Sequence, residues 1–184
     1  MDEEKLRELV ERAKNRDVEA FGSLYDFYVS GIYRYTYYRV GSKEDAEDLT
    51  EEVFLKALEA IGRFTWREVP FSAWLYRIAR NTVVDHFRRE TRRVQVVLEE
   101  DVMAPETTGP VELVAAKLSQ EEVQRAISRL TDDQQQVVIL KFFVGLSNSD
   151  IANFIGKTEG AVKALQHRAL ESLSKILRGS QGDE

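Results

Sequence analysis

One segment of the chain combines arginine with aromatic side chains. Residues 61–93 hold eight arginines, no lysine and only three acidic residues. Arginine makes forked contacts with phosphate, and aromatic rings stack on unpaired bases. Arg77, Asn81, Asp85 and Arg88 recur at helical spacing, so one polar face can contact phosphate and base edges. The pattern predicts a surface for DNA that is being opened, with a solvated arginine face as the plain alternative.

A second segment, residues 147–175, has the spacing of a helix-turn-helix. Ser147 is placed to cap a short helix, Gly156 to end it in the turn, and Thr158 to cap a longer helix. In such a unit the start of the second helix reads base edges in the major groove. A helical hairpin in a protein-interaction domain is the alternative. The exposed candidates for base contact are Lys157, Thr158, Glu159, Gly160, Lys163, Ala164, His167 and Arg168.

Charge is distributed in blocks along the chain. The net charge of −6 argues at first against a nucleic-acid partner. Residues 1–60 are acidic, with 15 acids against 9 bases, and residues 94–133 carry 9 acids against 3 bases. Only the arginine-rich segment between them is strongly basic. One short segment therefore suits anions, whereas the acidic blocks suit either a basic protein surface or solubility alone.

Amphipathic helices are expected along most of the chain. Apolar residues in the segment 6–13 follow the i, i+3, i+4, i+7 pattern of a helix. Asp17 and Ser42 are placed to cap the next two helices, and a fourth is expected from near Phe71 to about Arg89. No convincing strand pattern occurs, so we predict an all-α fold. The fourth helix offers core-packing candidates, namely Trp74, Leu75, Ile78, Val83 and Phe87.

Residues 94–110 form the expected linker. They begin with a short apolar run, Val94–Leu98, that fits a strand or an extended tether. The remainder holds acidic residues and two of the three prolines, which is poor helix material. Helical patterns resume from about Val111. We therefore predict two small helical domains, residues 1–93 and 111–184, joined by a flexible acidic linker.

The composition argues against several classes of protein. No apolar run approaches the roughly 20 residues that span a bilayer, and the acidic N-terminus is unlike a signal peptide. With no cysteine and two histidines, disulfides are excluded and a zinc site is not expected. Asp85 and His86 are adjacent, so on a helix they point about 100° apart and make no catalytic pair. We expect a cytoplasmic, non-enzymatic protein with no cofactor and no metal.

Two blocks of the chain resemble conserved regions of bacterial RNA polymerase sigma factors. Residues 45–57, 71–81 and 85–89 are similar to region 2 of that family, and residues 130–146, followed by 147–169, are similar to region 4. The blocks occur in the family's order with only a short linker between them. That organisation resembles the extracytoplasmic function (ECF) group, and it implies a region 2 helical bundle and a region 4 helix-turn-helix.

The resemblance implies a promoter-recognition subunit whose partners are core RNA polymerase, promoter DNA and an anti-sigma factor. Contact with the coiled coil of the largest polymerase subunit is implied for Asp45, Asp48, Glu51, Glu52, Phe54 and Leu55. Recognition and melting of the minus-ten element is implied for Arg63, Trp66, Arg77, Arg80, Asn81, Asp85, Arg88 and Arg89. Binding of the minus-thirty-five element is implied for Lys157, Thr158, Glu159, Gly160, Lys163, His167 and Arg168. The helices around Leu130–Phe143 would hold the flap of the second-largest subunit.

Several points stay open at this level. The chain has Glu51 and Leu58 where the family often has Gln and Trp, and the loop Phe64–Pro70 matches no fixed pattern. The promoter sequence, the anti-sigma factor and the loop residue that would hold a flipped base are therefore undetermined. A stand-alone helix-turn-helix regulator is the main alternative, and it should bind duplex DNA without polymerase. If the two domains pack together in the free protein, the packing would hide DNA-binding surfaces and keep the free subunit silent.

Overall fold

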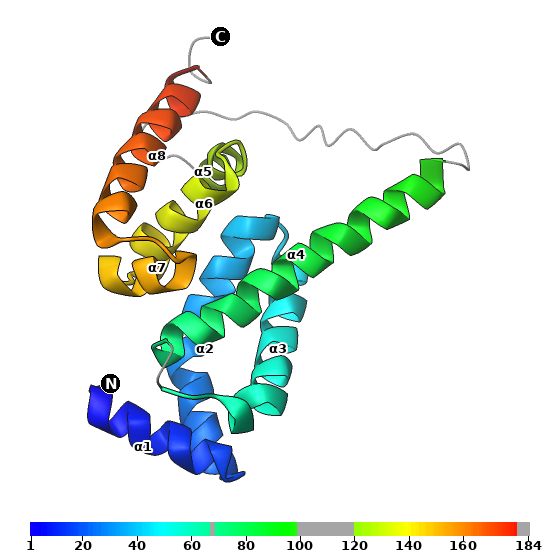
Figure 1. Ribbon diagram of the computed structural model, residues 1–184. Coiled ribbons are helices and arrows are strands. Elements are labelled where there is room, and N and C mark those ends of the chain that lie inside the picture. The colour runs from blue at the N-terminus through cyan, green and yellow to red at the C-terminus, as the bar shows by residue number, and fades with distance from the viewer. Residues whose placement is uncertain (67–68, 99–119, 180–184) are drawn as a thin grey trace.

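The computed structural model describes residues 1–66, 69–98 and 120–179, and side chains within 1–66, 69–92 and 120–178. Every element in these ranges is a helix, so the predicted all-α fold is confirmed for them. Figure 1 shows the helices as two units that lie against each other, α1 to α4 and α5 to α8. We refer to them as the N-terminal unit and the C-terminal unit.

The N-terminal unit is a helical bundle built around α2. Its caps are those the sequence predicts: Asp17 accepts the Ala20 amide at 3.1 Å, and Ser42 accepts the Asp45 amide at 3.2 Å. Between α2 and α3 the chain turns at Gly41, whose φ of +83° is the left-handed conformation that glycine adopts without strain. The elements of this unit are α1 (Glu3–Lys14), α2 (Val18–Val40), α3 (Lys43–Ala60), the short helix η1 (Ile61–Arg63) and α4 (Phe71–Leu98).

Helix α4 is longer than predicted. It runs to Leu98, not to about Arg89, so the interpretation of Val94–Leu98 as a strand or extended tether is wrong. The physical reason is that the segment contains neither glycine nor proline to end the helix, so α4 continues through it despite its three β-branched valines. Phe87 is 42% exposed, so its predicted core packing is also wrong, whereas Leu75 and Val83 are buried as expected.

The C-terminal unit contains the predicted helix-turn-helix. Ser147 accepts the Asp150 amide at 3.0 Å, Thr158 accepts the Ala161 amide at 3.2 Å, and Gly156 has a φ of +68° in the turn between them. Val162 is fully buried where the two helices cross. The elements are α5 (Gln120–Ser128), α6 (Asp132–Val138), the π-helical segment η2 (Ile139–Val144), α7 (Asn148–Ile155) and α8 (Glu159–Gly179).

The two units share one buried apolar cluster. At their boundary, η2 packs on α2, and the rings of Phe143 and Tyr38 lie 3.9 Å apart between centroids. A second contact joins α7 to α4. The packing therefore brings the helix-turn-helix unit against the arginine-bearing helix α4.

Candidate functional site

Helix α4 presents the predicted minus-ten residues on its surface. Arg77, Arg80, Asn81 and Arg88 are all exposed, as their helical spacing requires. Arg88 lies 3.6 Å from Asp85, but both side chains are more than half exposed, so this ion pair contributes little. The polar face expected from the sequence therefore exists on one continuous helix.

Two of these arginines are bound by the C-terminal unit. The Arg77 guanidinium donates to the backbone carbonyl of Asn153 at 3.0 Å, and Arg80 donates to the Asp132 carboxylate at 3.1 Å. Both contacts join α4 to residues more than fifty positions further along the chain. In this arrangement the two side chains lie at the boundary between the units.

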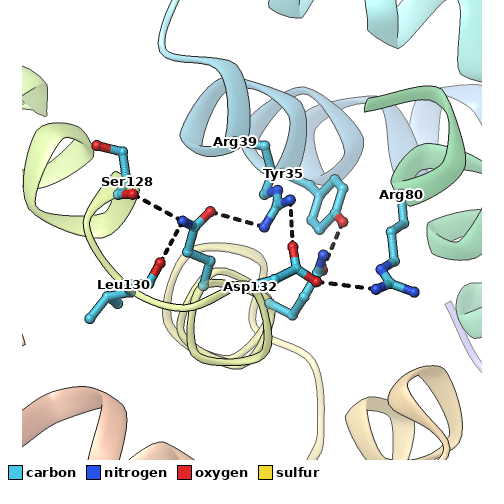
Figure 2. A network of polar contacts seen from close by, with 8 residues as sticks. Tyr35, Arg39, Arg80, Ser128, Leu130 and Asp132 are labelled. Atoms are coloured by element: carbon cyan, nitrogen blue, oxygen red, sulfur yellow. Dashed lines mark hydrogen bonds and ion pairs between the residues drawn. The ribbon is translucent and has the colours of Figure 1, made fainter. Parts of the chain in front are cut away.

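Asp132 lies at the centre of a polar network between the units (Figure 2). One carboxylate oxygen binds Arg39 of α2 at 2.7 Å, and the other binds Arg80. Arg39 also donates to Gln135 at 2.9 Å, and the Tyr35 hydroxyl donates to the Gln136 amide oxygen at 2.7 Å. We call these six residues the interdomain network: Tyr35, Arg39, Arg80, Asp132, Gln135 and Gln136.

Burial makes the charges of the network interdependent. The Arg39 side chain is only 6% exposed, so the Asp132 carboxylate that faces it compensates for the burial of its positive charge. Partial burial alone would raise the pKa of Asp132, but the nearby Arg39 and Arg80 charges lower it below its ordinary value. Burial raises the pKa of Tyr35 to about 12, which keeps its hydroxyl a donor to Gln136. Arg39 Nε and Gln136 Nε2 are buried without a hydrogen-bond partner.

Sequence reasoning assigned no interface role to this network. Tyr35 and Arg39 lie four residues apart on α2, which indicates only that they share a helix face. Their partners lie about a hundred residues away in sequence, at Gln136, Gln135 and Asp132. A charged residue in the last turn of a helix, such as Arg39, is ordinarily explained by the helix dipole. The long-range pairing gives no local signal.

The predicted minus-thirty-five surface at the start of α8 forms its ion pairs within its own unit, unlike the α4 surface. All seven predicted minus-thirty-five residues, from Lys157 to Arg168, are exposed at the start of α8 and in the turn before it. In the described part of the chain, Lys157 pairs with Asp133 at 3.5 Å and His167 lies 3.6 Å from Glu171, both within the C-terminal unit. This surface therefore faces solvent while the units are packed together.

Helix α3 carries the predicted polymerase-binding residues, but one of them, Phe54, is buried. Asp48 and Glu51 are exposed, and Leu55 is an exposed apolar side chain at 62%. Phe54 is buried and packs edge-on against Tyr25, so it is not available at the surface. Glu52 is paired with Lys56 at 2.7 Å and with Arg89 of α4 at 3.2 Å. Although burial opposes the shift, these two cations lower the pKa of the Glu52 carboxyl.

The loop between η1 and α4 is attached to α1 through Trp66. The Trp66 indole N–H donates to Glu11 at 3.1 Å, and the Arg7 guanidinium lies 5.1 Å from the ring centroid. The ring also meets Phe64 edge-on at 5.1 Å. Trp66 was predicted as a DNA contact, and α1 was assigned no role. Of the other predicted loop residues, Arg63 is exposed.

The residues whose structure is described carry neither a metal-binding cluster nor a membrane-spanning helix. Among them, no group of three or more histidine, cysteine, aspartate or glutamate side chains is arranged to hold a metal ion. None of their helices is both long and apolar enough to cross a membrane.

Comparison with known proteins gives matches to both units. Residues 24–93 match the family described as Sigma-70 region 2, and residues 120–173 match Sigma-70, region 4. The chain is 46% identical over 177 residues to the ECF RNA polymerase sigma factor BldN of Streptomyces coelicolor, covering 96% of this chain and 67% of that protein.

Solved structures share the fold. CnrH in complex with the cytosolic domain of CnrY matches with a TM-score of 0.71 at 25% identity, over 95% of this chain and 98% of that one. RpoE of Bartonella quintana, solved in complex with the anti-sigma factor NepR, matches with a TM-score of 0.68 at 24% identity, over 91% of this chain and all of the other.

Proposed function

The chain belongs to the extracytoplasmic function (ECF) RNA polymerase sigma factors, and from this premise we propose how its surfaces divide the work of promoter recognition. As a sigma subunit it binds core RNA polymerase and directs transcription initiation. Because α4 runs to Leu98, we assign residues 1–98 to a region 2 domain, residues 99–110 to an acidic linker and residues 111–184 to a region 4 domain. The chain acts in the cytoplasm as a binding subunit, and core polymerase supplies the catalysis.

The α4 face is assigned to the minus-ten element. Arg77, Arg80 and Arg88 would contact phosphate, since guanidinium groups suit forked bonds with its oxygens. Asn81, between them on the exposed face, would hydrogen-bond a base edge. Asp85 lies 3.6 Å from Arg88 on the same exposed face. Arg63 is a further exposed arginine in η1, and Arg89 would become available to DNA only on release of its ion pair with Glu52.

The start of α8 is assigned to the minus-thirty-five element. Lys163, His167 and Arg168 are exposed donors toward bases or phosphate, and Glu159 can accept from cytosine. Lys157, Thr158 and Gly160 lie in the turn and the first helical turn, where backbone N–H groups suit phosphate. The small net charge of this unit predicts weak binding without the rest of the holoenzyme.

Helix α3 is assigned to the polymerase coiled coil. Asp45, Asp48, Glu51 and Glu52 supply negative charge, and Leu55 supplies an apolar centre that is 62% exposed. We leave the buried Phe54 out of the contact surface and regard it as support for α3. The segment Leu130–Phe143 is assigned to the polymerase flap.

The observation that carries the proposal is that Arg77 and Arg80, which we assign to DNA binding, contact the C-terminal unit in the packed chain. In the packed chain one guanidinium nitrogen of each is bonded to Asn153 or Asp132, so those donors are not available to a DNA phosphate at the same time. The same packing places Phe143, in the flap-binding segment, against Tyr38. We therefore propose that the free chain is silent and that binding to core polymerase separates the two units.

An anti-sigma factor would exploit this closed state. CnrH and RpoE, which share the fold, were each solved in complex with another protein, and for RpoE that protein is an anti-sigma factor. We propose that an anti-sigma factor holds this chain with its units together. The two buried donors without a partner in the network, on Arg39 and Gln136, each oppose closure through their lost hydration.

The direct test mixes the purified chain with bacterial core RNA polymerase and a pool of promoter fragments. We expect co-migration with core in gel filtration and promoter-selective run-off transcripts that require both proteins. Specific binding to duplex DNA by the chain alone, with no association with core, would overturn the proposal and favour a stand-alone regulator. Co-migration without any transcript across a genomic fragment pool would indicate a polymerase-binding decoy and would equally contradict it.

A further inference from the structure

We propose that helix α1 is a positioning element for promoter recognition, which acts by holding the η1–α4 loop through Trp66. The inference rests on the proposed role of the α4 face and its adjoining loop in reading the minus-ten element. It adds a function for a helix outside the matched family region, because that match begins at residue 24 and α1 ends at Lys14.

Helix α1 is firmly fixed to the bundle. Its apolar stripe of Leu9, Val10 and Ala13 is buried against the core, and Asp2 caps its first turn by accepting the Lys5 amide at 2.8 Å. Burial of three apolar side chains gives the helix a fixed position. Its polar edge, which carries Arg7 and Glu11, can therefore serve as a rigid support for a neighbouring loop.

Both polar residues on that edge are directed at Trp66. Glu11 accepts the indole N–H at 3.1 Å, which fixes the edge of the ring, and Arg7 lies over its face at 5.1 Å from the centroid. A hydrogen bond fixes direction, and a cation over an aromatic face favours one side of the ring. Together they define both the position and the tilt of Trp66.

From Trp66 the restraint passes to the start of α4. Trp66 meets the buried ring of Phe64, which in turn meets Phe71 and Trp74 at 5.4 and 5.2 Å between centroids. These last two belong to the first turn of α4, the helix that carries the proposed minus-ten arginines. Phe64 and Trp66 are thus held between α1 and the first turn of α4.

A pocket of about 470 Å³ lies next to Trp66, lined by Leu6 and Arg7 of α1, by Val69, Pro70 and Ser72, and by Asp150 of α7. Beside this pocket, the contacts of Trp66 with Glu11 and Arg7 join α1 to the segment that precedes α4. Trp66 is therefore an anchor for the loop, and Arg7 and Glu11 are positioning residues.

The test uses holoenzyme assembled with core polymerase and a promoter set in which each minus-ten base is changed in turn. For Glu11→Ala we expect discrimination at the bases read by the loop to fall about fivefold, with affinity for core unchanged. Glu11→Gln keeps an oxygen that can accept the indole N–H and should restore most of the discrimination. Arg7→Leu should show a smaller loss in the same direction.

Two control variants separate positioning from other effects. Lys14→Gln removes the other ion-pair partner of Glu11, 3.1 Å away, and Glu4→Ala removes a second exposed carboxylate from α1. Both should leave discrimination unchanged. In a Trp74→Phe background Trp66 is the only tryptophan, so Glu11→Ala should shift its fluorescence emission to longer wavelength.

Results that overturn the inference can be distinguished from a result that overturns the proposed function. A uniform loss of activity on every promoter, accompanied by a lower Tm, would mean that α1 only stabilises the fold and would overturn the inference. Unchanged discrimination in Glu11→Ala, or equal losses in Glu11→Gln and Glu11→Ala, would overturn it as well. If the wild-type holoenzyme yields no core-dependent transcript, the proposed function itself fails, and the inference fails with it.

Discussion

The two proposed DNA-binding surfaces differ in what the closed chain does to them. On α4, Arg77 and Arg80 are bonded to the C-terminal unit. At the start of α8, Lys163 and Arg168 are exposed, and Lys157 pairs within its own unit. Packing of the units therefore engages two arginines of the surface proposed for opened DNA and leaves the surface proposed for duplex DNA accessible.

We propose that a single carboxylate, that of Asp132, controls whether the two units stay packed together. Asp132 binds both a buried arginine of α2 and an exposed arginine of α4. Its bond with Arg80 imitates the bond that a DNA phosphate would make, because both anions present oxygens to a guanidinium fork. We therefore propose that closure is a competition between an internal anion and DNA for the same side chain.

The largest expected effect follows from removing the shared arginines. Arg77→Ala combined with Arg80→Ala should lower promoter opening by holoenzyme about 100-fold, since each lost charge-assisted bond is worth roughly tenfold. Run-off transcription and binding to a fork-shaped promoter fragment measure it. Arg178→Ala, which removes an exposed arginine at the far end of α8, serves as the control. Full activity in the double variant would remove α4 from the DNA interface.

A smaller effect is expected on the other surface. Lys163→Ala or Arg168→Ala should reduce transcription about tenfold from promoters that carry both elements. Neither should alter binding of holoenzyme to a fragment that contains only the minus-ten element. Equal losses on both fragments would show that the two surfaces do not act separately, contrary to the comparison.

Removing the negative charge of Asp132 is expected to strengthen DNA binding by the free chain instead of weakening it. In Asp132→Asn the carboxylate charge is lost at nearly constant size, so we expect the free chain to bind single-stranded minus-ten DNA about fivefold more tightly. Asp133→Asn is a matched control, because it removes the same charge from the next residue, which pairs with Lys157. Affinities that rise equally in both variants would reflect net charge alone and would refute a specific role for Asp132.

The smallest effect concerns pH. The pKa of Asp132 is lowered in the closed chain, so its contribution to closure is complete above the ordinary carboxyl value of about 4 and is lost as the pH falls through the lowered value. Closure should therefore weaken only as the pH falls below about 4, as measured by binding of the free chain to single-stranded DNA at pH values on either side of about 4. In Asp132→Asn this pH dependence should be absent, and its persistence would assign it to another group.

Much of the fold follows from local patterns. Asp17, Ser42 and Ser147 were predicted as helix caps, and each accepts the expected backbone amide. Gly156 was predicted to end α7 and has a positive φ there. Caps and turns depend on neighbours within a few residues, so the sequence determines them directly.

The parts that were missed depend on distant residues or on weak local signals. Val94–Leu98 joined α4 because nothing nearby ends the helix, although its apolar run alone fits a strand. Phe54 was assigned to a partner surface from its motif, yet it packs on Tyr25. The pairing of Arg39 with Asp132 spans 93 positions, and no periodicity within one helix can indicate such a partner.

The measurement that tests the account most directly follows the distance between the two units. The chain contains no cysteine, so Glu59→Cys on α3 and Ser174→Cys on α8 provide two unique, exposed sites for fluorescent dyes. Single-molecule energy transfer should show one high-transfer population in the free chain, a broader distribution after Asp132→Asn, and a low-transfer population after core polymerase is added. Identical distributions for the free and the core-bound chain would contradict the claim that polymerase binding opens the closed sigma factor.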